Sequence, residues 1–352
     1  MKCNFQKEAR LNYVLILLLV GLLLSSYSLV PSKNKKESID YIEYTRTINK
    51  AESFVLDSSY FAALTTYEKA FEMVDKPLAG HCFTAMQVSA YLNKKHHFKK
   101  FMNEALKSGL EPKDFSKDSL LHSYIREQKL NTFLSKSYRK NSKIYSSQIN
   151  QKYRDTIDKL IEWDNKWKRI YLDTLSRVDP TNAETYNAKY DSIITLIVEN
   201  HLIPLIQEHG YPGERIIGSA RNGLGSKFNY SQSMGRILLW HYHTVKTLKP
   251  CEYNDLFFNE VKKGNMDPRE YATILDFQVN KGLDSLCGNV KTYNEHYIVN
   301  DTTYFKEFNV RREKIGLEPM DEVIQKYKRG QKVCKQIKEG KYKHIKLFYW
   351  CG

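Results

Sequence analysis

The chain has 352 residues, of which 41% are hydrophobic, and a formal net charge of +15. This length is sufficient for two modest domains, each with its own core. The six cysteines are too few for a disulfide scaffold. The basic residues are spread along the chain and match no known nucleic-acid-binding fold, so we expect no nucleic-acid partner.

Residues 1–36 hold the strongest single signal in the sequence. The run LNYVLILLLVGLLLSSYSLV, residues 11–30, carries no charge and follows Lys2, Lys7 and Arg10. A basic start before an apolar run is typical of a cleaved signal peptide, and this run is also long enough for an uncleaved membrane anchor. Both alternatives stay open. Both predict an exported or inner-membrane-anchored protein, with its bulk in the bacterial periplasm or cell envelope and a membrane contact through this segment.

Residues 37–136 show a helical pattern throughout and are predicted to form a first domain. A set of small and aromatic residues is echoed 35 positions later. The two sets are Ala63, Tyr67 and Ala70, then Phe98, Met102 and Ala105. A period of about 34 residues with Ala at a packing position is a mark of tetratricopeptide repeats, and the segment resembles about two such units. The resemblance implies a small peptide-binding or docking platform, and the alternative is an ordinary helical bundle.

The rest of the chain is also predicted to be helical. Residues 137–154 are polar and basic, which suits a linker or an exposed helix, and the domain boundary is expected there. Residues 155–330 are predicted to form a second helical domain that includes a helical run over 183–209. Residues 331–352 form a basic and aromatic tail. The predicted fold is therefore mostly α, with few or no strands.

Several short elements of the second region occur in a recognisable order. They are Asp164 with Arg169, Asn200, Gly210 to Gly213 with Gly218, His241 or His243, Gly264 through Asp276, and Arg311-Arg312 before Ile315-Gly316-Leu317. Over residues 155–330 this pattern resembles the bacterial domain-of-unknown-function family numbered 6624. The chain departs from that family where Cys287-Gly288 stands in place of Tyr-Gly, before an insertion that reaches Asn309. The family has no assigned biochemical role, so the resemblance implies a domain without implying a function.

The second region also holds the candidate catalytic residues, His241, His243, Asp276, Arg311 and Arg312. The two histidines are expected on a helix, where positions i and i+2 point apart, so we predict no metal site and no cofactor. Asp276 stands in an apolar stretch and needs a partner, which Arg311 or Arg312 can supply. The result is either a buried ion pair or a His-Asp-Arg pocket for an acidic ligand.

Five cysteines follow the apolar run, without the CxxC spacing that indicates a zinc or thioredoxin-like site. In an exported chain, Cys251 could pair with Cys287, or Cys334 with Cys351.

The sequence leaves two functions open. The repeat-like region favours a scaffold that binds protein or peptide partners of the envelope through helical grooves. The histidine, aspartate and arginine candidates favour a hydrolytic enzyme or an acidic-ligand-binding protein. Acid–base catalysis needs its groups within hydrogen-bond reach, so the placement of these side chains bears directly on the choice.

Overall fold

A computed structural model of the chain describes residues 40–218, 235–245, 249, 251–283, 285–288, 290–293, 302–338 and 345. The chain from Asp40 onward forms one compact unit. The predicted signal peptide or anchor, residues 1–36, lies outside the described residues. Within the described ranges, no helix combines the length and the apolar character needed to cross a bilayer.

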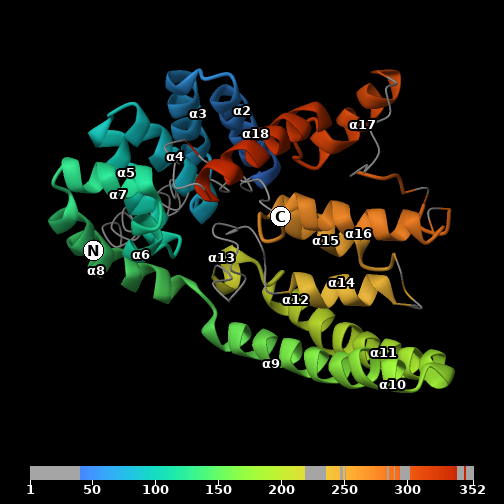
Figure 1. Cartoon of the computed structure of the whole chain (residues 1–352). Coiled ribbons are helices and arrows are strands. Elements are labelled where there is room, and N and C mark those ends of the chain that lie inside the picture. Colours follow the sequence, from blue (N-terminus) through green and yellow to red (C-terminus); the bar gives the residue numbers. More distant parts are fainter. Residues whose placement is uncertain are drawn as a thin grey trace, which may run out of the picture. The chain divides into compact units, whose positions relative to one another are not determined.

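The described part of the chain is mostly α-helical and contains no strand, as the sequence predicted (Figure 1). The helices of the first region are α2 (Tyr41–Leu56), α3 (Tyr60–Glu72), α4 (Ala79–Tyr91), α5 (Lys95–Lys107), α6 (Pro112–Ser116), α7 (Ser119–Glu127) and α8 (Asn131–Gln148). Those that follow are α9 (Gln151–Lys168), η2 (Arg169–Leu175), α10 (Ser176–Val178), η3 (Pro180–Asn182), α11 (Ala183–Ile197), η4 (Val198–Leu202), α12 (Ile203–His209), α13 (Glu214–Ile217), α14 (Arg236–Thr244), α15 (Asn254–Lys262), α16 (Pro268–Asn280), α17 (Thr302–Lys314) and α18 (Met320–Lys338).

One turn recurs three times in the first region. α2 packs against α3 and α4 against α5, while α7 packs on α4 and α8 on α5. The turns after α2, α4 and α7 each contain a residue in the left-handed conformation, Ser58, Asn93 and Lys129, with φ of 60°, 53° and 54°. In each turn the next amide donates to the carbonyl five residues back, which is the bonding of a Schellman helix end. These bonds join Ser59 to Phe54, Lys94 to Ser89, and Leu130 to Ile125.

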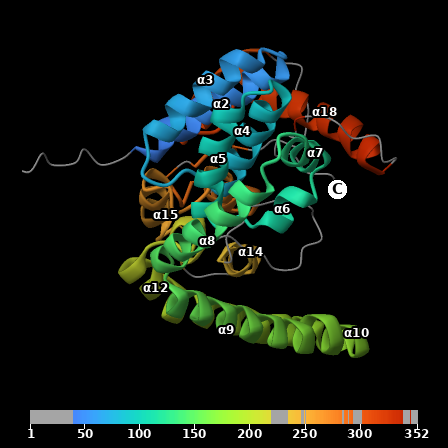
Figure 2. The ribbon, with the colours of Figure 1, turned by 90° about the vertical axis from the view of Figure 1, so that its left-hand side faces the viewer.

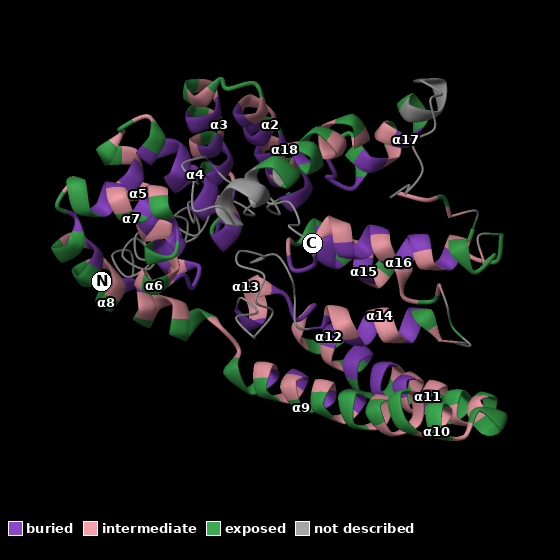
Figure 3. Cartoon of the chain, in the orientation of Figure 1, coloured by how far each residue is buried: buried purple, intermediate pink, exposed green. Residues whose placement is uncertain are grey.

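α4 is the most deeply buried of the described helices. Every residue from Ala79 to Ala90 is buried except His81, whereas α9 keeps an exposed face along its length (Figure 3). A helix with no exposed face must be surrounded by other elements. Its polar side chains are satisfied there, since Nε2 of Gln87 donates to Oδ2 of Asp118 at 2.7 Å.

The second region begins with a long rod. α9, η2 and α10 run without a break from Gln151 to Val178 (Figure 2). The expected helical run over 183–209 is present as α11, η4 and α12, and it ends at Gly210, whose φ of 86° lies in the left-handed region. η2 and η4 are π-helical. This conformation is rare in proteins, and where it occurs it is often found at a functional site. α14 packs against α9, α11 and η4, so the histidine helix lies beside one of the two π-helical stretches, η4.

The two regions predicted as separate domains pack on each other within the compact unit. A guanidinium nitrogen of Arg215 lies 3.1 Å from a carboxylate oxygen of Asp75, and Glu214 accepts from the amide of Ala79 at 2.6 Å. Residues 137–154 cover the second part of α8 and the first turn of α9, with Ile149 and Asn150 between the two helices. The predicted tail, 331–352, begins inside α18, and beyond Lys338 only residue 345 is described.

Candidate functional site

His241 on α14 is held by a buried carboxylate from α9. Its Nδ1 atom lies 2.7 Å from Oδ2 of Asp164, and the hydroxyl of Tyr190 donates to Oδ1 of the same carboxylate at 2.7 Å. Asp164 is 0% exposed, whereas the His241 side chain is 17% exposed. Burial, together with the bond to Asp164, raises the pKa of Tyr190 well above its usual value, so this hydroxyl keeps its proton. A carboxylate on Nδ1 fixes the imidazole and leaves Nε2 to act as a general base.

His243, two residues further along α14, belongs to the core. Its Nδ1 atom lies 2.8 Å from the carbonyl oxygen of Leu239, and its ring packs edge-on against Phe257. Burial lowers the pKa of His243 to about 4, so the imidazole is neutral at pH 7. The two histidines thus have different neighbours, as positions i and i+2 of a helix should. Among the residues that the structure describes, no group of three potential metal ligands occurs.

Asp276 and Arg312 hold the same backbone segment. Oδ1 of Asp276 accepts from the amide of Tyr293 at 2.6 Å, while the Arg312 guanidinium donates to the carbonyl of Tyr293. Nε of Arg312 also donates to the carbonyl of Glu318 at 2.7 Å. Both side chains are buried. The contacts fix the segment around Tyr293, and a catalytic role for the two residues stays a prediction.

The sequence did not identify the partner of His241. Asp164 stands 77 residues earlier, and its only signal was its place in the resemblance to family 6624. The remaining candidate, Arg311, lies with its guanidinium carbon 5.4 Å from the centre of the Phe308 ring. Among the predicted catalytic residues, His241 is therefore the one whose side chain lies in a hydrogen-bonded group of potentially reactive side chains, with Asp164 and Tyr190.

A small cavity lies between α2, α4, α13 and the start of α16. It has a volume of about 60 Å³, and its lining includes His81, Glu214, Asp267 and Arg269. Burial raises the pKa of Glu214 to about 7, while burial and the Arg269 charge lower the pKa of His81 to about 3. Since a water molecule occupies about 30 Å³ of the liquid, the space admits water or one small group. It is too small for an ordinary ligand pocket.

Beside this cavity lies a cluster of buried charges. Oε1 of Glu318 is 2.7 Å from an Arg269 nitrogen and 3.4 Å from Nζ of Lys326, which also bonds Glu52 of α2. Burial alone would raise the pKa of Glu318, but Arg269 and Lys326 outweigh it and hold that pKa well below its usual value. Burial also opposes the charge on Lys326, and Glu318 and Glu52 keep its pKa raised. The cluster joins α18 to α2 and has the character of a structural ion-pair network.

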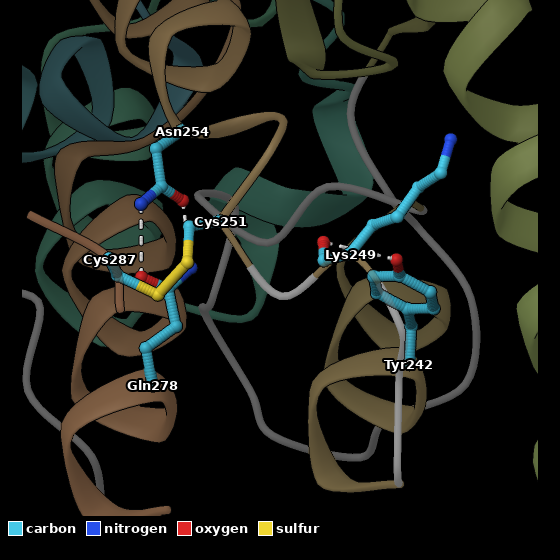
Figure 4. The surroundings of a disulfide bond; sticks show 6 residues. All are labelled: Tyr242, Lys249, Cys251, Asn254, Gln278 and Cys287. Carbon is cyan, nitrogen blue, oxygen red and sulfur yellow. Dashed lines mark hydrogen bonds between the residues drawn. A yellow bond between two sulfur atoms is a disulfide. The ribbon is translucent and has the colours of Figure 1, made fainter. Parts of the chain in front are cut away.

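A disulfide joins Cys251 to Cys287, one of the two pairs suggested by the sequence (Figure 4). It links the turn before α15 to the segment after α16, with Cα atoms 5.4 Å apart. Beside it, the side-chain amides of Asn254 and Gln278 exchange two hydrogen bonds, at 3.0 and 2.7 Å. Cys82 is a buried free thiol. The alternative pair, Cys334 and Cys351, has no described side chains.

The first region carries an exposed aromatic and basic surface at its turns. We define the turn surface as Tyr60, Phe61, Tyr91, Lys94 and Lys95. Phe61 is 62% exposed and Tyr91 is 49% exposed. The rings of Tyr60 and Tyr91 have their centres 4.5 Å apart, and Nζ of Lys94 lies 5.1 Å from the centre of the Phe61 ring. The turn surface therefore joins two consecutive helix pairs and leaves apolar area in contact with solvent.

Comparison of the chain with models of protein families, with curated proteins and with solved structures finds no match. The resemblances to tetratricopeptide repeats and to family 6624 thus stay predictions that depend on the residues given above. Function has to be inferred from the turn surface and from the group around His241.

Proposed function

We propose that this chain is a scaffold that binds protein or peptide partners through its turn surface. The observation that carries the proposal is the exposure of Phe61 and Tyr91 on adjoining turns of a repeating helical array. Large exposed aromatic side chains grouped on one surface are typical of protein contact sites. Aromatic residues also contribute much of the binding energy at such sites, because they bury a large area at low entropic cost.

The proposal includes a location in the bacterial envelope. The uncharged run at residues 11–30 would supply export or an inner-membrane anchor, and with it the membrane contact. The Cys251–Cys287 disulfide supports this, because such bonds form and persist mainly in oxidising compartments. The partners are then other proteins or peptides of the envelope.

A phage-displayed peptide library panned against the full-length chain tests the scaffold proposal. We expect enriched peptides whose affinity falls at least about tenfold in the Phe61→Ala/Tyr91→Ala variant, which corresponds to about 1.4 kcal/mol. Val178→Ala is the matched control, since Val178 is 78% exposed on α10. Failure to enrich any peptide, or equal binding by the double variant, would contradict the proposal.

A second candidate, a hydrolytic enzyme, is favoured by one observation, the 2.7 Å pairing of His241 with Asp164. This group shares only His241 with the pocket predicted from the sequence, which consists of His241, His243, Asp276, Arg311 and Arg312. Ester and phosphoester substrates that release a chromophore would be offered to the full-length chain. If the candidate is correct, turnover falls by at least about a hundredfold in His241→Ala and is unchanged in His122→Ala, an exposed histidine on α7. Turnover that is absent, or equal in both variants, removes this candidate.

A further inference from the structure

α8 presents a row of basic side chains to solvent. We define the basic row as Lys136, Arg139, Lys140 and Lys143, all of which are exposed. Positions i, i+3, i+4 and i+7 share one face of a helix. α8 contains no Asp or Glu, and no ion pair of the described residues includes a member of the basic row. The positive charge of this face is therefore uncompensated by the elements described around it.

The basic row is continuous with the turn surface. Phe133 stands one helical turn before Lys136, and Nζ of Lys99 lies 4.7 Å from the centre of its ring. Nζ of Lys95, in the turn surface, donates to the carbonyl of Gln128 at 3.1 Å. The side chain of Gln128 in turn donates to Asn93 at 3.2 Å. Direct contacts thus connect the turn after α4 to the turn after α7 and to the start of α8.

The joined surface carries a strong excess of positive charge. Segments 57–61, 91–99 and 127–143 hold eight lysines and arginines but only two carboxylates. The basic residues are Lys94, Lys95, Lys99, Lys129, Lys136, Arg139, Lys140 and Lys143, and the acidic ones are Asp57 and Glu127. A surface with one dominant sign of charge steers partners of opposite charge and selects among them.

We infer that the partner is an acidic protein segment that places apolar side chains on the turn surface and carboxylates along the basic row. This inference rests on the proposed scaffold function and names its partner class. Phe61 and Tyr91 supply apolar contact, and the basic row supplies charge, so the segment must combine both properties. Asp57 and Glu127 would repel a continuous phosphate backbone, while a polypeptide can place amides or a basic residue beside them.

Fluorescence anisotropy with synthetic peptides tests the inference. The probe is a labelled peptide of about twelve residues that alternates Glu with Phe or Leu, a length suited to cover several helical turns. Its counterpart carries Gln in place of every Glu. With the full-length chain, we expect the acidic peptide to bind at least about tenfold more tightly than its Gln counterpart, and salt to weaken only the acidic one.

Charge-reversal variants locate the effect. Lys136→Glu/Lys140→Glu should weaken the acidic peptide by at least about tenfold, whereas Lys262→Glu/Lys306→Glu, which alters exposed lysines on α15 and α17, should not. Circular dichroism and the Tm of each variant verify folding. Equal affinity for both peptides would overturn the acidic partner while leaving the scaffold function standing. Tighter binding to phosphatidylserine vesicles or to an oligonucleotide would also overturn it. If neither peptide binds and panning enriches none, the scaffold function itself is contradicted.

Discussion

At the scale of single residues, Glu318 shows how charge is retained inside the molecule. It is 3% exposed and keeps a low pKa only because Arg269 and Lys326 lie beside it. A carboxylate whose pKa is lowered on folding stabilises the protein above its unfolded pKa, and this stabilisation is lost as the pH falls. For Glu318 the contribution is complete above its ordinary value of 4.5 and decreases below it.

We therefore predict that Glu318→Gln lowers the free energy of unfolding at pH 7 by about 3 kcal/mol, because it leaves buried cations without their partner. The difference from the wild type should shrink as the pH falls below 4.5. Urea unfolding at a series of pH values measures it. Glu322→Gln is the control, because burial raises rather than lowers the pKa of Glu322 and its removal should cost less than about 1 kcal/mol. A pH-independent difference for Glu318→Gln would contradict the account.

Some features of the individual residues could be predicted from the sequence, and others could not. It placed His241 and His243 on a helix, as the structure shows for α14, because helical periodicity is a local property. It could not pair His241 with Asp164, since nothing local connects residues on α14 and α9. It paired Asp276 with arginine as one alternative, and in the structure Asp276 accepts from the amide of Tyr293 while Arg312 donates to the carbonyl of Tyr293.

At the scale of elements, the repeating unit was partly visible in the sequence. The offset of 35 residues between Ala63 and Phe98 predicted two repeat units, which stay a prediction, and both residues are fully buried in the structure. A third helix pair was not predicted from the sequence. When the chain is aligned on the turn residues Ser58, Asn93 and Lys129, Asn141 stands at the position of Ala70 and Ala105. A polar residue there breaks the apolar pattern, yet Asn141 is 2% exposed and donates to Oδ1 of Asn103 at 3.0 Å. At this position a hydrogen bond between Asn141 and Asn103 therefore stands where the repeat pattern has an apolar packing contact.

The recurring turn makes a prediction about stability. Lys129 holds a φ of 54°, which costs a residue with a side chain about 1 kcal/mol relative to Gly. Lys129→Gly should therefore raise the free energy of unfolding by about 0.5–1 kcal/mol. Asn93→Gly should gain less, because Asn tolerates the left-handed conformation. Thermal unfolding of both variants measures this, and a loss of stability in Lys129→Gly would show that its side chain contributes more than the backbone conformation costs.

At the scale of the whole molecule, Asp40 to Gly352 form one compact unit, and the division of this unit into two domains stays a prediction. Charged contacts such as Arg215 with Asp75 lie between the two regions. Sequence could not foresee this, because polar residues such as Asp75 and Arg215 read as solvent-exposed until their partners are known. The mostly α-helical fold class was predictable, because it depends on the periodicity of apolar residues along the sequence.

The Cys251–Cys287 disulfide links the turn before α15 to the segment after α16. It closes a loop with a sequence separation of 36, for which removal costs about 3–4 kcal/mol. We predict that Cys251→Ser/Cys287→Ser lowers the free energy of unfolding by this amount. Reduction of the wild type should lower its stability to the same level. A variant as stable as the wild type under oxidising conditions would mean that the bond does not form.

The central claim is that partners bind the turn surface, and hydrogen exchange of the full-length chain with and without a panned peptide tests it most directly. The account predicts slower exchange in the bound state at residues 57–61, 91–95 and 127–131, where the three turns lie. Segment 235–245 around His241 should exchange at the same rate in both states. Protection confined to 235–245, with none at the turns, would contradict the claim and favour the group around His241 as the working site.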